Sequence, residues 1–214
     1  MKESFATRLK YYLLWMLPVS VVFFGLYPTI NTFTTTRSDT LTLWLPVELS
    51  IPFIPAFIWA YLSMYLIILV PLFFLNLREQ KRLAIELMVV TIAGAMIFLL
   101  FPARLGFVRQ LPADPLYHAL FSQLLSLDRP HNLVPSLHVA WSWTVVCAIS
   151  RRTRGWIPTV LYFWFIAIAL STLFIHQHHV LDVATGLLLS LVVSYFTGKV
   201  YEKNPPASLN AHQS

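Results

Sequence analysis

The chain has 214 residues, of which 57% are hydrophobic and only 11% are charged, and this composition excludes an ordinary soluble globular domain. Its single cysteine, Cys147, excludes an internal disulfide. The net charge of +6 does not indicate a nucleic acid partner, because the basic residues lie at the ends of apolar segments and not on one polar face. Long uncharged stretches separated by short charged ones are typical of a multi-pass helical membrane protein.

Six apolar segments follow one another along the chain as candidate transmembrane helices. The fourth is the shortest, and it spans a bilayer only if it begins at Pro135, which places His138 below the membrane surface. The polar connection over residues 31–50 contains no evident chemistry. We predict an all-α bundle of six transmembrane helices in one domain, residues 1–203, followed by a disordered tail, residues 204–214. The predicted spans are residues 11–30, 49–76, 87–103, 135–150, 155–175 and 180–198.

A further helix is predicted between the third and fourth spans. Asp114 followed by Pro115 is a helix start signal, since Asp favours the N-cap and Pro the first helical position. Leucines then recur at helical spacing as far as Leu127. We expect this helix either to lie in the membrane interface or to pack on the bundle as an ordinary loop helix.

The distribution of basic residues predicts how the spans are oriented. If the N-terminus is cytoplasmic, most of the Lys and Arg residues fall on the cytoplasmic side, which is the positive-inside pattern. Both termini then lie in the cytoplasm of a multi-pass cell membrane protein. Four basic residues fall on the other side, namely Arg37, Arg104, Arg109 and Arg129. The same non-cytoplasmic face carries polar residues from distant segments, among them His131, Ser136, His138, His176, His178 and Asp182.

His178 and Asp182 lie four residues apart at the mouth of the last span. An ionisable residue inside an otherwise uncharged span is by default a functional-site hypothesis. Residues i and i+4 are neighbours on a helix, so we expect the Asp182 carboxylate to bond one nitrogen of the His178 ring. Such a bond fixes the tautomer and leaves the other nitrogen a better nucleophile or base. The alternative, a pair that only stabilises the helix, is disfavoured in an uncharged span.

The tetrapeptide Pro135-Ser136-Leu137-His138 opens the fourth span. Ser136 is the expected N-cap, and a capped helix start offers free N–H groups and a positive dipole end to a phosphate. His138 precedes His178 by about 40 residues and is predicted on the same membrane face. Two histidines, one of them oriented by an acid, indicate phosphoryl transfer without a metal or a cofactor. The candidate side chains for binding negative charge are Arg104 and Arg109.

These motifs resemble the phosphatidic acid phosphatase type 2 superfamily, whose six-helix members carry Pro-Ser-Gly-His and, about 40 residues later, Ser-Arg-x5-His-x3-Asp. The resemblance implies that His178 attacks phosphorus to form a phosphohistidine, that Asp182 orients His178, and that His138 protonates the leaving oxygen. It implies a bilayer-embedded enzyme acting on a lipid phosphate, such as phosphatidate or an isoprenyl (di)phosphate. The matched candidates for substrate binding are Ser136, Leu137, Ser171 and Thr172.

The chain departs from the family pattern at several positions. Thr172 stands where the family has Arg, Leu137 replaces Gly, and the first family motif, Lys-x6-Arg-Pro, is absent. This pattern is similar to the sphingolipid branch, the inositol phosphorylceramide and sphingomyelin synthases, which keep the two histidines and the aspartate. The resemblance therefore implies a lipid phosphate phosphatase, with a lipid headgroup phosphotransferase as the alternative.

Two functions from other classes stay open on the residues alone. A membrane metalloenzyme could use His176, His178 and His179, since imidazoles suit iron or zinc, although such enzymes need more clustered histidines. A transporter could use Asp182 as a proton or ion site. If His178 is the nucleophile, His176 and His179 point to other faces, where we expect them to contact the surface or lipid headgroups.

Overall fold

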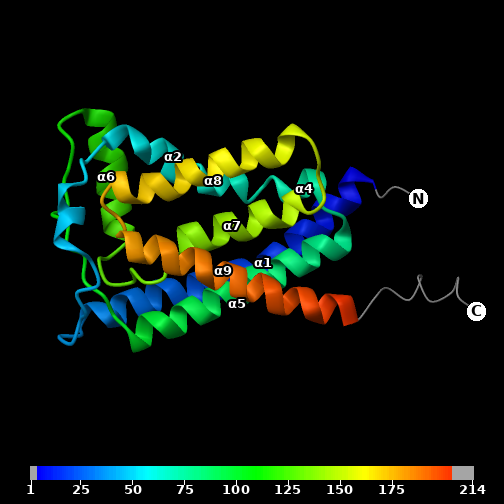
Figure 1. Cartoon of the computed structure of the whole chain (residues 1–214), viewed down its shortest axis with the longest axis horizontal. Helices are drawn as coiled ribbons and strands as arrows, with labels where there is room; N and C mark the ends of the chain where they lie inside the picture. The colour runs from blue at the N-terminus through cyan, green and yellow to red at the C-terminus, as the bar shows by residue number, and fades with distance from the viewer. Residues whose placement is uncertain (1–3, 204–214) are drawn as a thin grey trace, which may run out of the picture.

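The computed structural model describes residues 4–203, and its regular structure is helical apart from one isolated β-bridge between Leu41 and Ala103. This confirms the predicted all-α class. The predicted tail, residues 204–214, lies outside the described residues, as do residues 1–3. The long helices run side by side along one axis, and α1 (Phe5–Thr35) begins at the same end at which α9 (Val180–Lys203) finishes (Figure 1).

Within residues 4–203, five stretches are long and apolar enough to cross a membrane. They are α1, the stretch Pro55–Phe74, α5 (Leu77–Leu100), α8 (Trp156–Phe174) and α9. A sixth apolar helix, α7 (Leu137–Ser150), has 14 residues, which is shorter than a full crossing requires. The fold is therefore that of an all-α polytopic membrane protein, and the number of six spans stays a prediction.

The second predicted span is divided into short helices. It begins at Pro55 and not at residue 49, because the preceding residues form the separate short helix η1 (Pro46–Ser50). Proline lacks a backbone N–H and is favoured in the first turn of a helix, where Pro46, Pro55 and Pro71 all lie. The resulting segments are η2 (Pro55–Phe57), α2 (Ile58–Leu62), α3 (Met64–Ile67) and α4 (Pro71–Phe74).

The third predicted span begins earlier than expected, at Leu77 and not at residue 87, because a capping box formed by Asn76 and Glu79 starts α5 there. The first turns of α5 therefore contain charged residues. Arg78 and Lys81 are exposed, whereas Glu86 is buried and its charge is paired within the bundle.

Glu86 is the centre of this pairing. Its side chain is fully buried, and its Oε1 accepts hydrogen bonds from Arg82 Nε (2.8 Å) and from the Thr197 hydroxyl of α9 (2.6 Å). Its Oε2 lies 3.6 Å from Arg151, the residue that follows α7. These contacts join α5, α7 and α9 in the half of the bundle farther from α6 (Figure 1).

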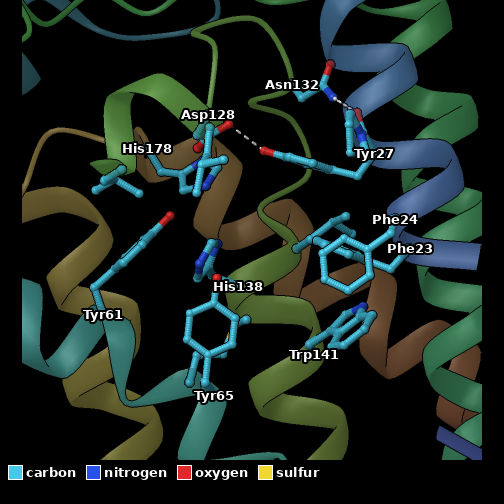
Figure 2. Close-up of a pocket in the computed structure, with 15 residues that line it drawn as sticks. Phe23, Phe24, Tyr27, Tyr61, Tyr65, Asp128, Asn132, His138, Trp141 and His178 are labelled. Carbon is cyan, nitrogen blue, oxygen red and sulfur yellow. Dashed lines mark hydrogen bonds between the residues drawn. The ribbon is translucent and has the colours of Figure 1, made fainter. Parts of the chain in front are cut away.

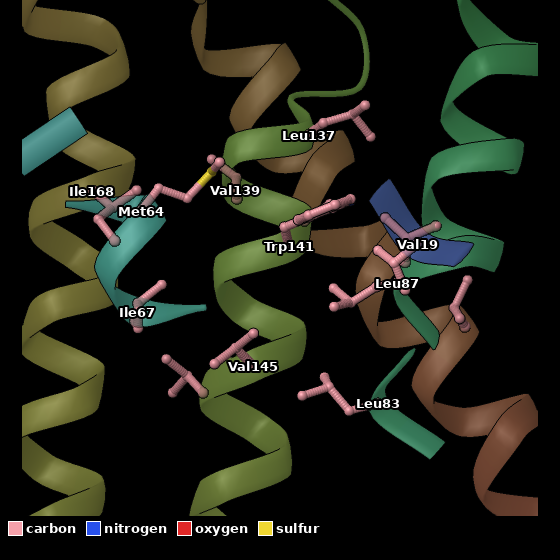
Figure 3. Packing of buried hydrophobic residues seen from close by; sticks show 14 of the residues in the cluster. Val19, Met64, Ile67, Leu83, Leu87, Leu137, Val139, Trp141, Val145 and Ile168 are labelled. Carbon is pink, nitrogen blue, oxygen red and sulfur yellow. The ribbon is translucent and has the colours of Figure 1, made fainter. Parts of the chain in front are cut away.

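Helix α7 lies at the centre of the main hydrophobic core, between α8 on one side and α5 and α9 on the other (Figures 1 and 3). Val139, Val145 and Ile149 are completely buried, and the Trp141 indole donates to the Thr91 hydroxyl of α5 (3.0 Å). Close packing of this kind, together with interhelical hydrogen bonds, holds membrane helices together. The short central helix therefore presents its N-terminus, with Ser136 and His138, at a fixed position.

Helix α6 (Pro115–Leu127) begins where the sequence predicted, since Asp114 Oδ1 accepts from the N–H groups of Leu116 and Tyr117. It lies across the end of the bundle opposite the start of α1 (Figure 1). Phe121 is buried against Ile58 and Tyr61, whereas Leu127 is 71% exposed. The helix therefore packs on the bundle through one face and leaves apolar side chains open on another.

Candidate active site

His178 lies in the loop that joins α8 to α9, two residues before α9 begins. Its Nδ1 is 3.2 Å from Asp182 Oδ2, and both side chains are buried. An ionised carboxylate can only accept, so Nδ1 carries the proton and Nε2 keeps its electron pair. The predicted contact therefore forms, but not between two helical residues, because Asp182 reaches back from the first turn of α9 to a residue that precedes the helix.

Two carboxylates cap the N-terminus of α9 and so fix the His178 loop. Asp182 Oδ2 accepts from the backbone N–H of His179 (2.8 Å), and Glu48 Oε2 accepts from that of Val180 (2.8 Å). Glu48 Oε2 also lies 3.2 Å from His179 Nδ1. Burial raises the pKa of the Glu48 carboxyl, but the N–H donors and His179 outweigh burial and hold this pKa below its usual value.

Glu48 was not predicted as a site residue, because residues 31–50 showed no evident chemistry. The signal that could have found it is its isolation, since Glu48 is the last charged residue before Arg78 and follows the proline that starts η1. A carboxylate at the start of a long uncharged stretch needs hydrogen-bond donors when it is buried, and the start of α9 supplies them.

Ser136 caps α7 as predicted, with its Oγ accepting from the N–H of Val139 (3.5 Å). Its own N–H donates to the backbone oxygen of Asp182 (2.9 Å), which ties the start of α7 to the first turn of α9. Gly186 permits this close approach, because a Cβ there would lie 2.4 Å from the Ser136 oxygen. The junction brings His138 and His178 together although they are distant in sequence.

The rings of His138 and His178 have centroids 6.3 Å apart. His138 stacks on Tyr61 with centroids 4.1 Å apart, and its Nε2 is buried without a hydrogen-bond partner among residues 4–203. A nucleophile attacks phosphorus from about 3 Å, and an acid bonds the leaving oxygen at about 3 Å. The separation of the rings therefore suits a phosphoryl group held between them.

A cavity of about 240 Å³ opens onto both histidine rings (Figure 2). Its walls come from α1, α2, α3, α6 and α7 and are mainly aromatic and aliphatic, which suits an amphiphilic ligand. Leu137 lines the cavity, whereas Ser136 lies behind it as the cap of α7. The aromatic lining residues are Phe23, Phe24, Tyr27, Tyr61, Tyr65 and Trp141.

Asp128, which follows α6, is an acid in the cavity wall that was not among the predicted site residues. Its Oδ1 accepts from the Tyr27 hydroxyl (2.6 Å) and from Asn31 Nδ2 (3.5 Å). Burial raises the pKa of the Asp128 carboxyl above its ordinary value, although the Tyr27 hydrogen bond, His178 and Arg109 oppose the shift.

The two candidate arginines lie in different places. Arg104 is exposed, donates to the Thr42 hydroxyl (2.9 Å) and does not line the cavity. Arg109 is half-buried, and its Nη1 lies 3.5 Å from the backbone oxygen of Leu125. Burial lowers the pKa of the Arg109 guanidinium, while the nearby Asp128 carboxylate raises it. Of the two, only Arg109 is close enough to influence the charge of the site.

Ser171 and Thr172 are fully buried near the end of α8 and do not line the cavity. Their hydroxyls donate to carbonyl oxygens of their own helix, at 2.6 Å and 2.8 Å. The backbone oxygen of Thr172 accepts from the N–H groups of Gln177 and His178, each at 3.0 Å. Thr172 thus supports the His178 loop from behind.

His176 and His179 are buried, which corrects the expectation that they contact the surface or lipid headgroups. Phe107 stacks on both imidazoles, with centroids 4.0 Å and 4.4 Å away. His176 Nε2 lies 2.9 Å from the Ile51 oxygen, and His179 Nε2 accepts from the N–H of Gly106 (3.0 Å). The three histidines of this loop therefore face three different partners and do not converge as metal ligands would.

The bundle and its cavity define a polytopic helical membrane protein that carries two histidines and an acid in one site. Residues 103–206 match the family model of the PAP2 superfamily, and this segment contains His138, His178 and Asp182. This match confirms the family resemblance that the motifs predicted. It supports a lipid-related function of the phosphatase or phosphotransferase type. None of the curated proteins compared with the chain matches it.

Proposed function

We propose that the protein is a metal-independent lipid phosphate phosphatase, or a closely related lipid phosphotransferase, that works through a phosphohistidine at His178. The observation that carries the proposal is the arrangement of His178 and His138 on one cavity, with Asp182 bonded to Nδ1 of His178. This arrangement supplies a nucleophile, an acid and an orienting group, which are the parts that covalent phosphoryl transfer needs.

The first step forms a bond between His178 Nε2 and phosphorus and breaks the bond from phosphorus to the lipid oxygen. His138 gives its proton to that oxygen, and Asp182 stabilises the charge that develops on the His178 ring. In the second step a hydroxyl oxygen attacks phosphorus, the electron pair of the nitrogen–phosphorus bond returns to Nε2, and the hydroxyl proton passes to His138.

The attacking hydroxyl decides the reaction class. Water gives hydrolysis of a phosphatidate-like or isoprenyl (di)phosphate lipid, whereas an alcohol gives transfer of a phosphorylated headgroup to another lipid. The second reaction is favoured by one observation, namely that Thr172 stands where the family has a clamping arginine and that the Lys-x6-Arg-Pro motif is absent. The active site is expected on the non-cytoplasmic face.

The test incubates the purified full chain with phosphatidate, farnesyl diphosphate, and phosphatidylinositol or phosphatidylcholine mixed with a ceramide acceptor. Free phosphate and new headgroup lipids are scored separately. His178→Ala is expected to lose activity by about 1,000-fold or more and Asp182→Asn by about 100-fold or more, since both act on one covalent step.

Phosphohistidine is acid-labile and base-stable, so trapping with ³²P-labelled substrate at high pH tests the intermediate directly. Label is expected on the parent protein and not on His178→Ala. If none of these lipids reacts, or if His178→Ala reacts as well as the parent, the proposal is wrong. Ion flux in liposomes that survives His178→Ala but not Asp182→Asn would instead support a transporter.

A further inference from the structure

Asp128 is an ionisable group on the cavity wall for which the proposed reaction has no use. It lines the same cavity as His138 and His178, and Figure 2 shows it beside His178 with the Tyr27 hydroxyl on its other side. Asp128 and His178 are close enough for a positive charge on the His178 ring to lower the pKa of the Asp128 carboxyl. A negative group at this place affects any phosphate that His178 attacks.

The contacts of Asp128 supply hydrogen-bond donors that stabilise its ionised form. Both donors near it, the Tyr27 hydroxyl and the Asn31 amide, are directed at Oδ1. Among residues 4–203, Oδ2 has no hydrogen-bond partner and is left to the cavity. Tyr27 and Asn31 belong to α1, so the carboxylate is held in place by a helix other than the one it ends.

Asp128 also offsets the positive charge nearest to it. Arg109 and Asp128 influence each other electrostatically, and the other candidate arginine, Arg104, lies away from the cavity. Arg109 does not line the cavity either, and among residues 4–203 the lining contains Asp128 but no Lys or Arg, so this wall has no net positive charge from Lys or Arg. A phosphomonoester carries a charge of about −1.5 to −2 at neutral pH, and a phosphodiester carries a charge of about −1. The electrostatic repulsion between the ligand and the Asp128 carboxylate is therefore stronger for a monoester than for a diester.

We propose that Asp128 makes this cavity select lipid phosphodiesters over lipid phosphomonoesters. This inference rests on the proposed phosphohistidine chemistry and narrows its substrate class. With a diester, His178 Nε2 forms its bond to phosphorus, the bond from phosphorus to the diacylglycerol oxygen breaks, and that oxygen takes the His138 proton. The headgroup stays esterified to the phosphorus, ready for transfer to water or to an alcohol.

Two probes that differ by one methyl group, and therefore in charge, test the selection. Dioleoyl phosphatidate and dioleoyl phosphatidylmethanol have the same chains and the same leaving group, and a methyl cap removes the second charge. Diacylglycerol release by the purified full chain is measured with each lipid in mixed micelles. The parent protein is expected to have the higher kcat/KM for phosphatidylmethanol.

Asp128→Asn is expected to raise kcat/KM for phosphatidate and to shift the ratio between the two lipids by about 10- to 100-fold, as removal of one nearby charge predicts. A merely destabilised protein loses activity on both lipids and does not gain on one. Tyr27→Phe removes the hydrogen bond but keeps the charge, so it is expected to keep the preference for phosphatidylmethanol. Asp39→Asn, at an exposed carboxylate paired with Arg37, serves as the matched control.

Asp128→Ser is assayed in parallel, so that the ratio is available if the Asn variant does not fold. A parent protein that prefers phosphatidate, or a ratio that both Asp128 variants leave unchanged, overturns the selection while the phosphohistidine reaction stands. Cleavage of both lipids that survives His178→Ala, or cleavage of neither, overturns the reaction and the selection with it.

Discussion

At the scale of the single residue, the carboxylate of Glu48 joins segments of the site that are far apart in the sequence. It accepts hydrogen bonds from Leu45 and Val180 and lies 3.2 Å from His179 Nδ1, so it ties η1 to the start of α9. When a buried acceptor that serves several donors is removed, each donor loses its hydrogen bond, and each lost bond costs about 1 to 3 kcal/mol of stability.

Glu48→Ala is therefore expected to destabilise the protein by about 2 to 4 kcal/mol, because it leaves two part-buried N–H groups and the buried His179 ring without an acceptor. The same change is expected to lower activity, since the His178 loop loses its outer support. Thermal unfolding in detergent measures the first effect and lipid turnover the second. The control is Glu202→Gln, at an exposed position of α9. An unchanged melting temperature for Glu48→Ala would contradict this role.

His179 predicts how stability depends on pH. Burial lowers its pKa below the usual 6.5, although Asp182 and Glu48 oppose the shift. The unfolded chain therefore takes up a proton before the folded one does, so this contribution to stability is intact above about pH 6.5 and is lost as the pH falls toward the lowered pKa. Between about pH 7 and about pH 5, the melting temperature of His179→Gln is expected to fall less than that of the parent.

In His179→Gln, the dependence of the melting temperature on pH is expected to become weaker but not to vanish. Burial also lowers the pKa of His131 and of His176, so these two residues contribute in the same direction. Equal slopes for parent and variant would show that His179 does not take part.

At the scale of the helix, the contact between α7 and α9 depends on a missing side chain. A Cβ at Gly186 would meet the backbone oxygen of Ser136 at 2.4 Å, and Ser136 precedes His138 by only two residues. Gly25 in α1 is a matched control, since a Cβ there has nothing within 4 Å.

Gly186→Ala is expected to cost about 1 to 3 kcal/mol of stability and to reduce turnover by about 100-fold, because a small shift of reacting groups is costly. Gly25→Ala is expected to leave turnover unchanged and to stabilise α1 slightly, since Ala is the better helix former. Melting temperature and kcat are measured for both. Equal turnover in the two variants would mean that the α7–α9 contact does not position the histidines.

The contacts of the helices also show which features the sequence could predict and which it could not. Caps at Ser136 and Asp114 followed from local chemistry, and the structure has both. Burial of Glu48 against the start of α9 joins residues 132 apart in the sequence, and the contact of Asp128 with Tyr27 joins residues 101 apart. Hydropathy and spacing describe neighbours along the chain, and neither carries information on such distant pairs.

At the scale of the whole molecule, the positive-inside pattern predicts sidedness. In a Cys147→Ala background, a single cysteine at Val108 is expected to react with a membrane-impermeant maleimide in intact cells. One at Arg154 is expected to react only after permeabilisation. Both positions are exposed, so access by solvent does not distinguish them. The Cys147→Ala protein alone is the unlabelled control, and the reverse result would invert the topology.

The buried ion pair of Glu86 with Arg82, together with Arg151 and Thr197, has a mechanical consequence. It joins α5, α7 and α9 in the half of the bundle farther from α6, whereas the cavity lies among the loops near α6 (Figure 1). The Ser136–Asp182 hydrogen bond joins α7 to α9 at the cavity end as well. Two rods joined at both ends can neither splay nor slide past one another, so thermal motion of α7 against α9 is expected to be small where His138 and His178 lie.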